Sequence, residues 1–282
     1  MNMIKCTVIV SVYKDTASLD LILQALARQS VIPNEVIISE DCDSQEMLSY
    51  VALAKTKYPA LNLNHLSQED LGWRKNRALN RAVVSAENEY LIFIDGDCVP
   101  FDDFVENHLG KAQVGSALAG KRIELGPRMT KQVYEGTLST SKIANNWFSY
   151  IPMLIKDKAR HLEDIIHIKY NSFWSFLTNK EARSIIGCNW SVYKKDLLEI
   201  NGFNEDYTLP SVGEDTDLVW RFKGLGITIN SCRYNANIIH LFHEKRFNPD
   251  IQKTNREIMK KNQDLRQYVC INGINRWFDV IA

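Results

Sequence analysis

The sequence predicts an α/β fold with an open, mainly parallel sheet and helices on both faces. Two observations lead to this prediction. Continuous apolar and β-branched runs, typical of strands that are covered on both faces, recur along the first hundred residues. Each run is followed by a stretch in which apolar residues return at helical spacing. Strands that alternate with helices in this way predict consecutive βαβ units.

The first half of the chain supplies most of these elements. A strand is expected at residues 6–12, and the helix after it carries Leu19, Ile22, Leu23 and Leu26 on one face. Asp, Thr and Ser residues just before that helix can cap its N-terminus. The other elements expected here are a strand at 35–39, a helix at 45–57, a short strand at 61–66, a helix at 75–85 and a strand at 90–94.

The regular alternation lapses after Pro100. Residues 120–186 mix aromatic side chains such as Trp147 and Trp174 with Lys and Arg, and we expect a helical insert packed on the sheet. Such an insert could be an acceptor lid, a dimer contact, a membrane-surface patch or an ordinary elaboration of the fold. Recognisable elements are predicted again after this insert: a strand-like stretch at 187–193, a helix at 214–223, an edge strand at 227–230 and a polar C-terminal helix at 255–268.

Composition excludes several classes of protein. The 282 residues include 34 Lys and Arg against 34 Asp and Glu, so no global charge attracts nucleic acid. The six cysteines are widely spaced, which indicates neither a zinc site nor a disulfide framework and fits a reducing compartment. No signal-peptide pattern and no apolar run of about 18 residues occurs. We expect a cytoplasmic protein, with contact at the inner face of the membrane left open.

An acidic pair, Asp95 and Asp97, directly follows the strand expected at 90–94. Ligands of open α/β sheets bind at the carboxyl ends of strands, where two carboxylates one residue apart suit Mg²⁺ or Mn²⁺. A plain turn is the alternative, since Asp and Gly also favour turns.

A second acidic group, Glu214, Asp215 and Asp217, begins a helix, where acids stabilise the N-terminus. A carboxylate kept charged there can also accept a proton from a substrate hydroxyl.

Two further segments could take part in binding. His240 and His243, three positions apart, could offer an imidazole to a metal or a diphosphate. The basic residues Arg74, Lys75 and Arg77 could hold phosphate groups, or form a solvated helix face. The chain has neither a Walker-type phosphate loop nor the glycine pattern of dinucleotide-binding proteins. A Walker-type NTPase and a simple nicotinamide dehydrogenase therefore lose their best evidence.

Taken in order along the chain, these segments resemble the family 2 glycosyltransferases with the GT-A fold. They are most similar to the subgroup whose C-terminal half is similar to galactosyltransferases and polypeptide N-acetylgalactosaminyltransferases. The resemblance extends from residue 4 to about residue 245. It depends on Val10-Ser11-Val12-Tyr13, Ser39-Glu40-Asp41, residues 68–74, Asp95-Gly96-Asp97, residues 187–191, Asn201-Gly202-Phe203, Gly213-Glu214-Asp215 and His240.

The resemblance implies one GT-A domain, a Rossmann-like mixed sheet with a helical insert. Its parts would be a nucleotide-binding half at 1–119, the insert at 120–186, an acceptor and catalytic half at 187–250 and a helical extension at 251–282. The implied activity is metal-dependent, inverting transfer of a sugar from a nucleotide-sugar, expected to be a UDP-sugar. The acceptor would be a hydroxyl of a glycan or of a lipid-linked glycan in surface polysaccharide or lipopolysaccharide synthesis.

Nucleotide contacts are the first roles that the resemblance implies. Val10, Tyr13 and Asp41 would contact the base and ribose, with Asp41 accepting a hydrogen bond from a uracil ring. The family commonly has Ala-Arg-Asn where this chain has Ala78-Leu79-Asn80. Asn80 is therefore placed with the nucleotide, and Arg74 or Arg77 would supply the charge.

The metal and the reacting sugar would be held by the remaining family positions. Asp97 would bind Mn²⁺ or Mg²⁺ directly, and Asp95 would face the ribose or a metal-bound water. His240 is similar to the family's metal-ligating His, and we prefer it to His243 because it follows the apolar pair Ile238-Ile239. The resemblance further implies Asp215 as general base, Glu214 as the residue that orients donor or acceptor hydroxyls, and Asn189 and Trp190 near the donor or acceptor sugar.

Some departures and alternatives remain open. The subgroup usually has an aromatic or glycine-rich lead into Gly-Glu-Asp, whereas residues 209–212 are Leu-Pro-Ser-Val, so an acceptor-stacking ring is missing there. A nucleotidyltransferase would also use an Asp-based metal site, but residues 9–16 contain no Gly and no Arg. The third interpretation is a noncatalytic module that binds nucleotide-sugars or glycans.

Overall fold

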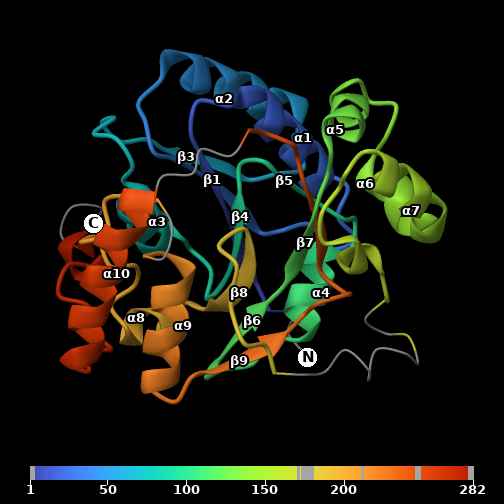
Figure 1. Cartoon of the computed structure of the whole chain (residues 1–282). Helices are drawn as coiled ribbons and strands as arrows, with labels where there is room; N and C mark the ends of the chain where they lie inside the picture. Colours follow the sequence, from blue (N-terminus) through green and yellow to red (C-terminus); the bar gives the residue numbers. More distant parts are fainter. Residues whose placement is uncertain (1–3, 170–171, 173–180, 211–212, 245–248, 279–282) are drawn as a thin grey trace.

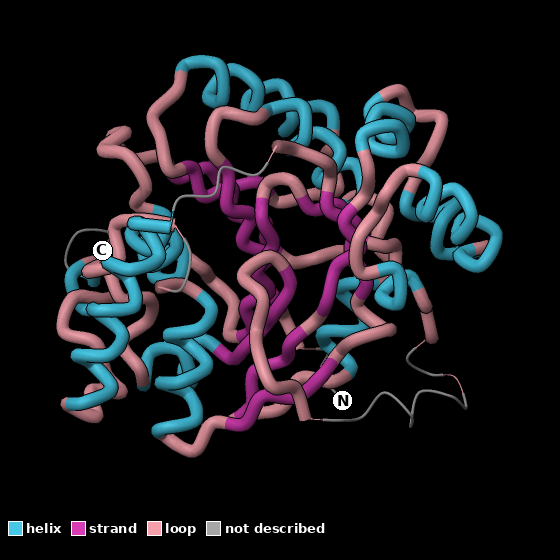
Figure 2. Tube along the Cα trace, in the orientation of Figure 1, coloured by secondary structure: helices cyan, strands magenta, loops and turns pink. Residues whose placement is uncertain are grey.

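A seven-stranded mixed sheet runs through the middle of the structure, with helices on both sides (Figures 1 and 2). The computed structural model describes residues 4–169, 172, 181–210, 213–244 and 249–278. The strands of this sheet are β1 (Cys6–Val12), β2 (Glu35–Glu40), β3 (Leu63–Leu66), β4 (Tyr90–Asp95), β6 (Ser116–Ala119), β8 (Asn189–Tyr193) and β9 (Thr228–Ser231).

The order of the strands is β3-β2-β1-β4-β8-β6-β9. Only β8 runs antiparallel to its neighbours, β4 and β6, so the predicted mainly parallel sheet is confirmed. Because β1, β2 and β4 are parallel, their carboxyl ends lie at the same edge of the sheet. Asp41 and Asp95 follow or end two of these strands, and the sheet therefore brings them to one edge.

Helices connect the parallel strands of the first half as the sequence predicts. They are α1 (Thr16–Leu26), α2 (Gln45–Lys57) and α3 (Lys75–Ser85). Side-chain oxygens of Asp15 and Ser44 accept hydrogen bonds from backbone N–H groups in the first turns of α1 and α2. Such caps satisfy donors that a helix start otherwise leaves unpaired.

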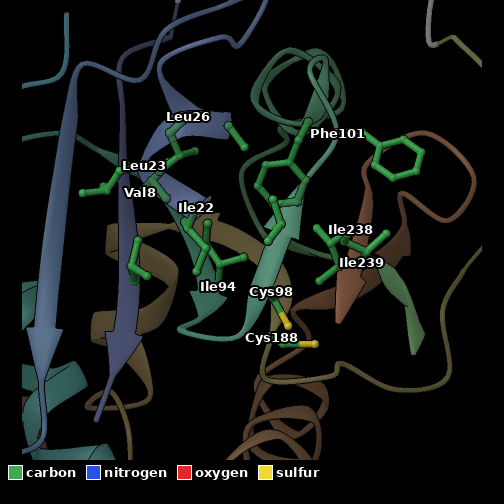
Figure 3. Packing of buried hydrophobic residues seen from close by; sticks show 14 of the residues in the cluster. Val8, Ile22, Leu23, Leu26, Ile94, Cys98, Phe101, Cys188, Ile238 and Ile239 are labelled. Carbon is green, nitrogen blue, oxygen red and sulfur yellow. The ribbon is translucent and has the colours of Figure 1, made fainter. Parts of the chain in front are cut away.

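Alternate residues of β1 face two separate cores. Val8 and Val10 pack in a cluster with Leu23 and the other apolar residues of α1 and α2, whereas Ile9 packs on the opposite face. Figure 3 shows Val8 beside Ile22 and Leu23. The second cluster includes residues of α3, α8 (Lys194–Glu199) and α9 (Asp215–Gly224). Burial on both faces explains why β1 has an uninterrupted apolar sequence.

A second sheet of three short strands positions the C-terminal His residues. It has the order β5 (Cys98–Pro100), β10 (Asn237–His240) and β7 (Lys121–Glu124). His240 pairs with Cys98 across β10 and β5, next to Asp97. Sequence analysis predicted none of these three strands, because three or four residues are too few to show a periodicity.

The expected helical insert is only partly helical. It begins with β7 rather than a helix, and its helices are α5 (Pro127–Tyr134), α6 (Thr140–Asn145), α7 (Trp147–Lys156) and the short η1 (Leu162–Ile165). Figure 1 shows α5, α6 and α7 together at one side of the molecule. Trp174 and the other aromatic residues of 173–180 lie outside the described residues.

The remaining helices complete the fold. α4 (Phe104–Gly110) precedes β6, and η3 (Ile274–Arg276) lies near the C-terminus. α10 (Pro249–Asp264) begins and ends a few residues earlier than the helix predicted at 255–268. Across the described part of the chain, we find no helix that combines the length and apolar character needed to cross a bilayer.

Candidate active site

A cavity of about 640 Å³ opens at the carboxyl ends of β1 and β4. It brings together segments that lie far apart in the sequence, from the loop after β1 to the residues after β10. Its wall carries the polar side chains of Tyr13, Asp41, Lys75, Asp95, Asp97 and His243. This is the location at which open α/β sheets bind their ligands.

One end of the cavity holds Asp97 between two imidazoles. Asp97 Oδ2 lies 3.3 Å from His240 Nε2 and 3.2 Å from His243 Nε2. Sequence analysis treated the two His residues as competitors, but the structure places both beside the same carboxylate. Burial alone would raise the pKa of Asp97. Hydrogen bonds from both imidazoles, together with the charge of His240, outweigh burial and hold that pKa well below its ordinary value.

These side chains form a donor set that fits a divalent cation. Candidate ligand atoms of Asp97, Cys98 and His240 lie within 4.8 Å of one another. A carboxylate kept ionised and two imidazoles bind divalent cations readily, and imidazole favours a first-row transition metal over Mg²⁺. The cation would be held by Asp97 and His240, which belong to this cluster, and His243 lies outside the cluster but beside the same Asp97 oxygen.

The next part of the site is a cation bridge made by Lys75. Lys75 Nζ lies 2.6 Å from Asp95 Oδ1 and 2.6 Å from Glu214 Oε1. Lys75 begins α3, Asp95 ends β4, and Glu214 is the residue just before α9. A side chain at Gly187 would collide with the Glu214 carboxylate, so the glycine permits this approach. The bridge joins the two acidic segments that the sequence places about 120 residues apart.

The ion pair of Glu214 with Lys75 is influenced by other charges nearby, which change the pKa of Glu214. Burial raises the pKa of Glu214 to about 7, and the nearby charges of Asp95 and Asp215 add to this increase. The ammonium group of Lys75 acts in the opposite direction. For Lys75, burial opposes the charged form, but Asp95 and Glu214 together raise its pKa above the ordinary value. The bridge therefore holds a stable cation beside a carboxyl group that titrates near neutral pH.

Asp215 lies beside this bridge but is not among the residues that line the cavity. Its Oδ1 accepts a hydrogen bond from Thr216 Oγ1 at 3.3 Å. Its negative charge contributes to the raised pKa of Glu214. Ser211 and Val212, which precede the acidic segment Glu214-Asp215, lie outside the described residues.

The opposite end of the cavity has hydrogen-bonding groups suited to a base or a ribose. Asp41 accepts hydrogen bonds from Gln68 Nε2 at 2.7 Å and from the backbone N–H of Arg74 at 2.8 Å. Burial raises the pKa of Asp41, although these hydrogen bonds oppose that change. The Tyr13 hydroxyl donates to Asp70 at 3.0 Å, which holds the exposed ring at the cavity wall.

Arg74 is not among the residues that line this cavity, although its backbone N–H donates to the cavity residue Asp41. One guanidinium nitrogen donates to the carbonyl oxygens of Trp73 and Thr208. The side chain lines a different, smaller pocket with Arg77 and Trp277. The charge that sequence analysis expected from Arg74 at the nucleotide is therefore not presented at the cavity wall.

Four other residues predicted for the site are buried in the core, and none is among those that line the cavity. Val10 belongs to the apolar cluster between β1 and α1. Asn80 bonds to the backbone of Phe203 and to Glu205. Their side chains are engaged in the core, and their predicted contact with a nucleotide stays a prediction.

The same holds for the two residues predicted near the sugar. The Asn189 amide donates to the carbonyls of Lys121 and Ala236, and its oxygen lies 3.1 Å from His108 Nε2. Trp190 stacks on Phe93 with ring centroids 4.2 Å apart. Both side chains stabilise the junction of β8 with its neighbours, and the structure gives them no place at the cavity.

Lys75 and Tyr134 are among the cavity residues that sequence analysis did not assign to the site. The sequence showed Lys75 only as part of a basic segment at the start of a helix. It did not indicate which carboxylates would pair with the Lys75 ammonium group. Tyr134, at the end of α5, lines the cavity and lies 2.7 Å from Ser18 Oγ through its hydroxyl. No periodicity in the sequence relates α5 to the carboxyl end of β1.

Comparison with known proteins adds an independent line of evidence. Residues 7–182 match Glycosyl transferase family 2, and residues 170–244 match the family described as the N-terminal domain of galactosyltransferase. The chain is 25% identical over 248 residues to the validoxylamine A glucosyltransferase of Streptomyces hygroscopicus subsp. limoneus. This match covers 82% of the chain and 51% of the relative, so the chain spans about half the length of that protein.

Solved structures share the fold. A mannosyltransferase from Pyrobaculum calidifontis, in complex with GDP-Man and Mn²⁺, matches with a TM-score of 0.57 and 16% identity. That match covers 98% of this chain and 70% of the other. GalNAc-T7, with UDP, GalNAc and Mn²⁺, matches with a TM-score of 0.62 and 10% identity over 98% of this chain and 56% of its own. Both similarities extend over nearly the whole chain.

Proposed function

The chain belongs to glycosyl transferase family 2, and from this premise we propose that it moves a sugar from a nucleotide-sugar to an acceptor hydroxyl. The observation that carries this proposal is that Lys75, a cavity residue, joins the two acidic segments through ion pairs with Asp95 and Glu214. Asp97 lies at the metal-binding end of the same cavity. A cation site and a proton acceptor are the two groups that such a transfer needs close together.

The donor that we propose is a UDP-sugar. Asp41 lines the end of the cavity away from the two His residues, and its carboxylate oxygens can accept a hydrogen bond from the N–H of a uracil ring. The exposed ring of Tyr13 lies in the same wall, where a base can stack on it. The solved relatives carry different nucleotides, GDP-Man in one and UDP in the other, so the Asp41 contact is the basis for this choice.

The cofactor that we propose is Mn²⁺ or Mg²⁺, held by Asp97, His240 and His243, with Asp95 facing the ribose or a metal-bound water. Both solved relatives were determined with Mn²⁺, and the two imidazoles favour Mn²⁺ over Mg²⁺. A bound divalent cation would stabilise the negative charge that develops on the departing diphosphate. The low pKa of Asp97 keeps its carboxylate charged for this task.

The acceptor hydroxyl would be activated by the second acidic segment. Asp215 takes the proton, the acceptor oxygen forms its bond to the anomeric carbon, and the bond from that carbon to the diphosphate oxygen breaks. Glu214 orients the donor or acceptor hydroxyls from its position on Lys75. A single base on the face opposite the leaving group inverts the anomeric configuration. The acceptor that we propose is a glycan or a lipid-linked glycan in surface polysaccharide synthesis at the cytoplasmic face of a membrane.

Release of nucleoside diphosphate tests this function directly. Purified protein is incubated with a panel of UDP- and GDP-sugars and candidate glycan acceptors, with Mn²⁺, with Mg²⁺ or with a chelator. We expect acceptor-dependent release with one donor, loss of that release in chelator, and loss in Asp215→Asn. Asp264→Asn on the exposed face of α10 is the matched control and should behave as wild type. Donor binding without turnover on any acceptor would instead indicate a noncatalytic binding module.

A further inference from the structure

The helix α7 presents an apolar ridge to solvent. Phe148, Pro152 and Ile155 recur at positions i, i+4 and i+7, which lie on one face of a helix, and all three are exposed. Phe148 is 64% exposed and Ile155 60%. Leu154 is the one buried residue of the helix. Figure 1 shows α7 at the margin of the molecule, away from the central sheet.

The segment that contains this helix is strongly basic. Residues 127–160 include six Lys and Arg residues against two acidic ones, in a chain whose formal net charge is zero. The two acids are already engaged, because Asp157 accepts hydrogen bonds from the backbone N–H groups of Arg128 and Met129, and Glu135 pairs with Lys131. Within this segment, cations that have no acidic partner among the described residues therefore outnumber acidic groups that have no partner.

Four of these cations gather around a groove that leads to the site. A hollow of about 770 Å³ is lined by Arg128, Lys156, Lys158 and Arg160, together with the acidic residues Glu124, Asp157 and Glu244. In the part of the chain that the structure describes, Arg160 reaches Glu124 only at 3.8 Å, and the other three cations form no ion pair. The hollow also contacts His240 and shares Phe242 and His243 with the donor cavity. This groove, whose lining carries both cations and acidic residues, thus connects the end of α7 with the metal-binding end of the active site.

We propose that α7 and the cations around this groove dock on an anionic lipid surface. An apolar helix ridge flanked by Lys and Arg has the chemistry of helices that lie in a membrane interface. A lipid surface admits Phe148 and Ile155 without a complementary groove, and its negative headgroups match the positive charge of residues 127–160. The positive charge, rather than exposure alone, favours lipid over an apolar protein partner or a second copy of the chain.

Docking in this way has a consequence for the acceptor, and here the inference rests on the proposed function. The groove would lie against the headgroups, with its far end at His243. An acceptor that carries a phosphate group on a lipid would place that phosphate at the four cations and its sugar at the cavity. Docking in this orientation therefore favours an acceptor of the lipid-linked class.

Vesicle flotation tests the docking without any turnover. Wild-type protein is mixed with vesicles of phosphatidylcholine alone, or of phosphatidylcholine and phosphatidylglycerol in equal amounts. We expect flotation with the anionic vesicles only, and its loss at high salt. Phe148→Ser with Ile155→Ser should abolish flotation, and Lys156→Gln with Lys158→Gln should weaken binding about 25-fold, about fivefold for each cation. Leu48→Ser with Leu53→Ser, equally exposed on α2, is the matched control and should float as wild type.

Several results would overturn the docking proposal. These are no flotation of the wild type, equal flotation on neutral vesicles, or equal losses in the α7 and α2 variants. Self-association that the α7 double variant abolishes, without flotation, would assign the ridge to a second copy instead. Circular dichroism confirms that each variant is folded. Transfer to a soluble acceptor, measured in the same variants, separates a failure of docking from a failure of the proposed function.

Discussion

Two carboxyl groups of the same site, Asp97 and Glu214, have opposite electrostatic environments. The Asp97 side chain is 31% exposed and that of Glu214 is 16% exposed, and partial burial favours the neutral form of both carboxyl groups. At Asp97 two imidazoles outweigh burial and keep the pKa low. At Glu214 the single ammonium group of Lys75 does not outweigh burial, because Asp95 and Asp215 add negative charge nearby. The pKa of Glu214 therefore rises to about 7.

This difference teaches how one cavity can hold a cation and move a proton. A carboxylate that stays ionised at every working pH suits a metal ligand. A carboxyl group that titrates near neutral pH suits a residue that exchanges hydrogen bonds or protons with a hydroxyl. Three changes test whether the two ends act separately, in order of decreasing effect.

The largest effect is expected at the end that handles the proton. Asp215→Asn should lower the rate of transfer by about 10²–10⁴-fold, since a positioned base contributes that much. Donor binding should change little, because Asp215 does not line the donor cavity. Steady-state kinetics together with calorimetric titration of the donor measure both quantities. Transfer above a tenth of the wild-type rate, with the variant folded, would remove Asp215 from this role.

A smaller effect is expected from each imidazole at the metal end. His240→Ala and His243→Ala should each weaken Mn²⁺ binding by at least about tenfold, a cost measured even for residues that only support a metal ligand. Both imidazoles lie within 3.3 Å of the same Asp97 oxygen, which is why two losses of similar size are expected. Activity as a function of Mn²⁺ concentration gives the apparent constants. An unchanged constant in one variant would leave the other His as the only imidazole ligand.

The smallest effect is a shift in the pH profile. Because the pKa of Glu214 is raised to about 7, its ionised form is lost as the pH falls through that value. If Glu214 acts ionised, kcat/KM at pH 6 should be about a tenth of its plateau. Lys75→Met removes the neighbouring positive charge, so the rising limb should move to higher pH.

Glu214→Gln is the control for this profile, because it removes the titrating group and should remove the limb near pH 7. Measurement of kcat/KM between pH 5 and 9 in the three proteins decides the question. A limb that persists unchanged in Glu214→Gln belongs to another group, and the contrast between the two carboxyl groups would then play no part in catalysis.

The parts of the site that the sequence predicted are those set by local pattern. Asp95 and Asp97 follow an unmistakable buried strand, and Glu214 and Asp215 begin an amphipathic helix, so the ends of these elements could be placed without knowledge of the fold. The strands β1 to β4 and the helices α1 to α3 were predicted for the same reason. Each depends on residues that are close in sequence.

The parts that the sequence did not predict depend on contacts between distant segments. The bridge of Lys75 to Glu214 joins α3 to the start of α9, and the short strands that bring His240 to Asp97 are too brief to show a pattern. Asn189 and Trp190 show the converse. They belong to a motif that resembles the family's, but the fold uses them to pack β8.

The most direct test of the central claim is the binding of UDP and Mn²⁺ to Asp97→Asn. In the wild type we expect Mn²⁺ to strengthen UDP binding at least about tenfold, as measured by calorimetric titration with and without the metal. In Asp97→Asn that difference should disappear, while Asp215→Asn should retain it. Equal enhancement by Mn²⁺ in Asp97→Asn and in the wild type would contradict the assignment of the metal to Asp97 and its two imidazoles.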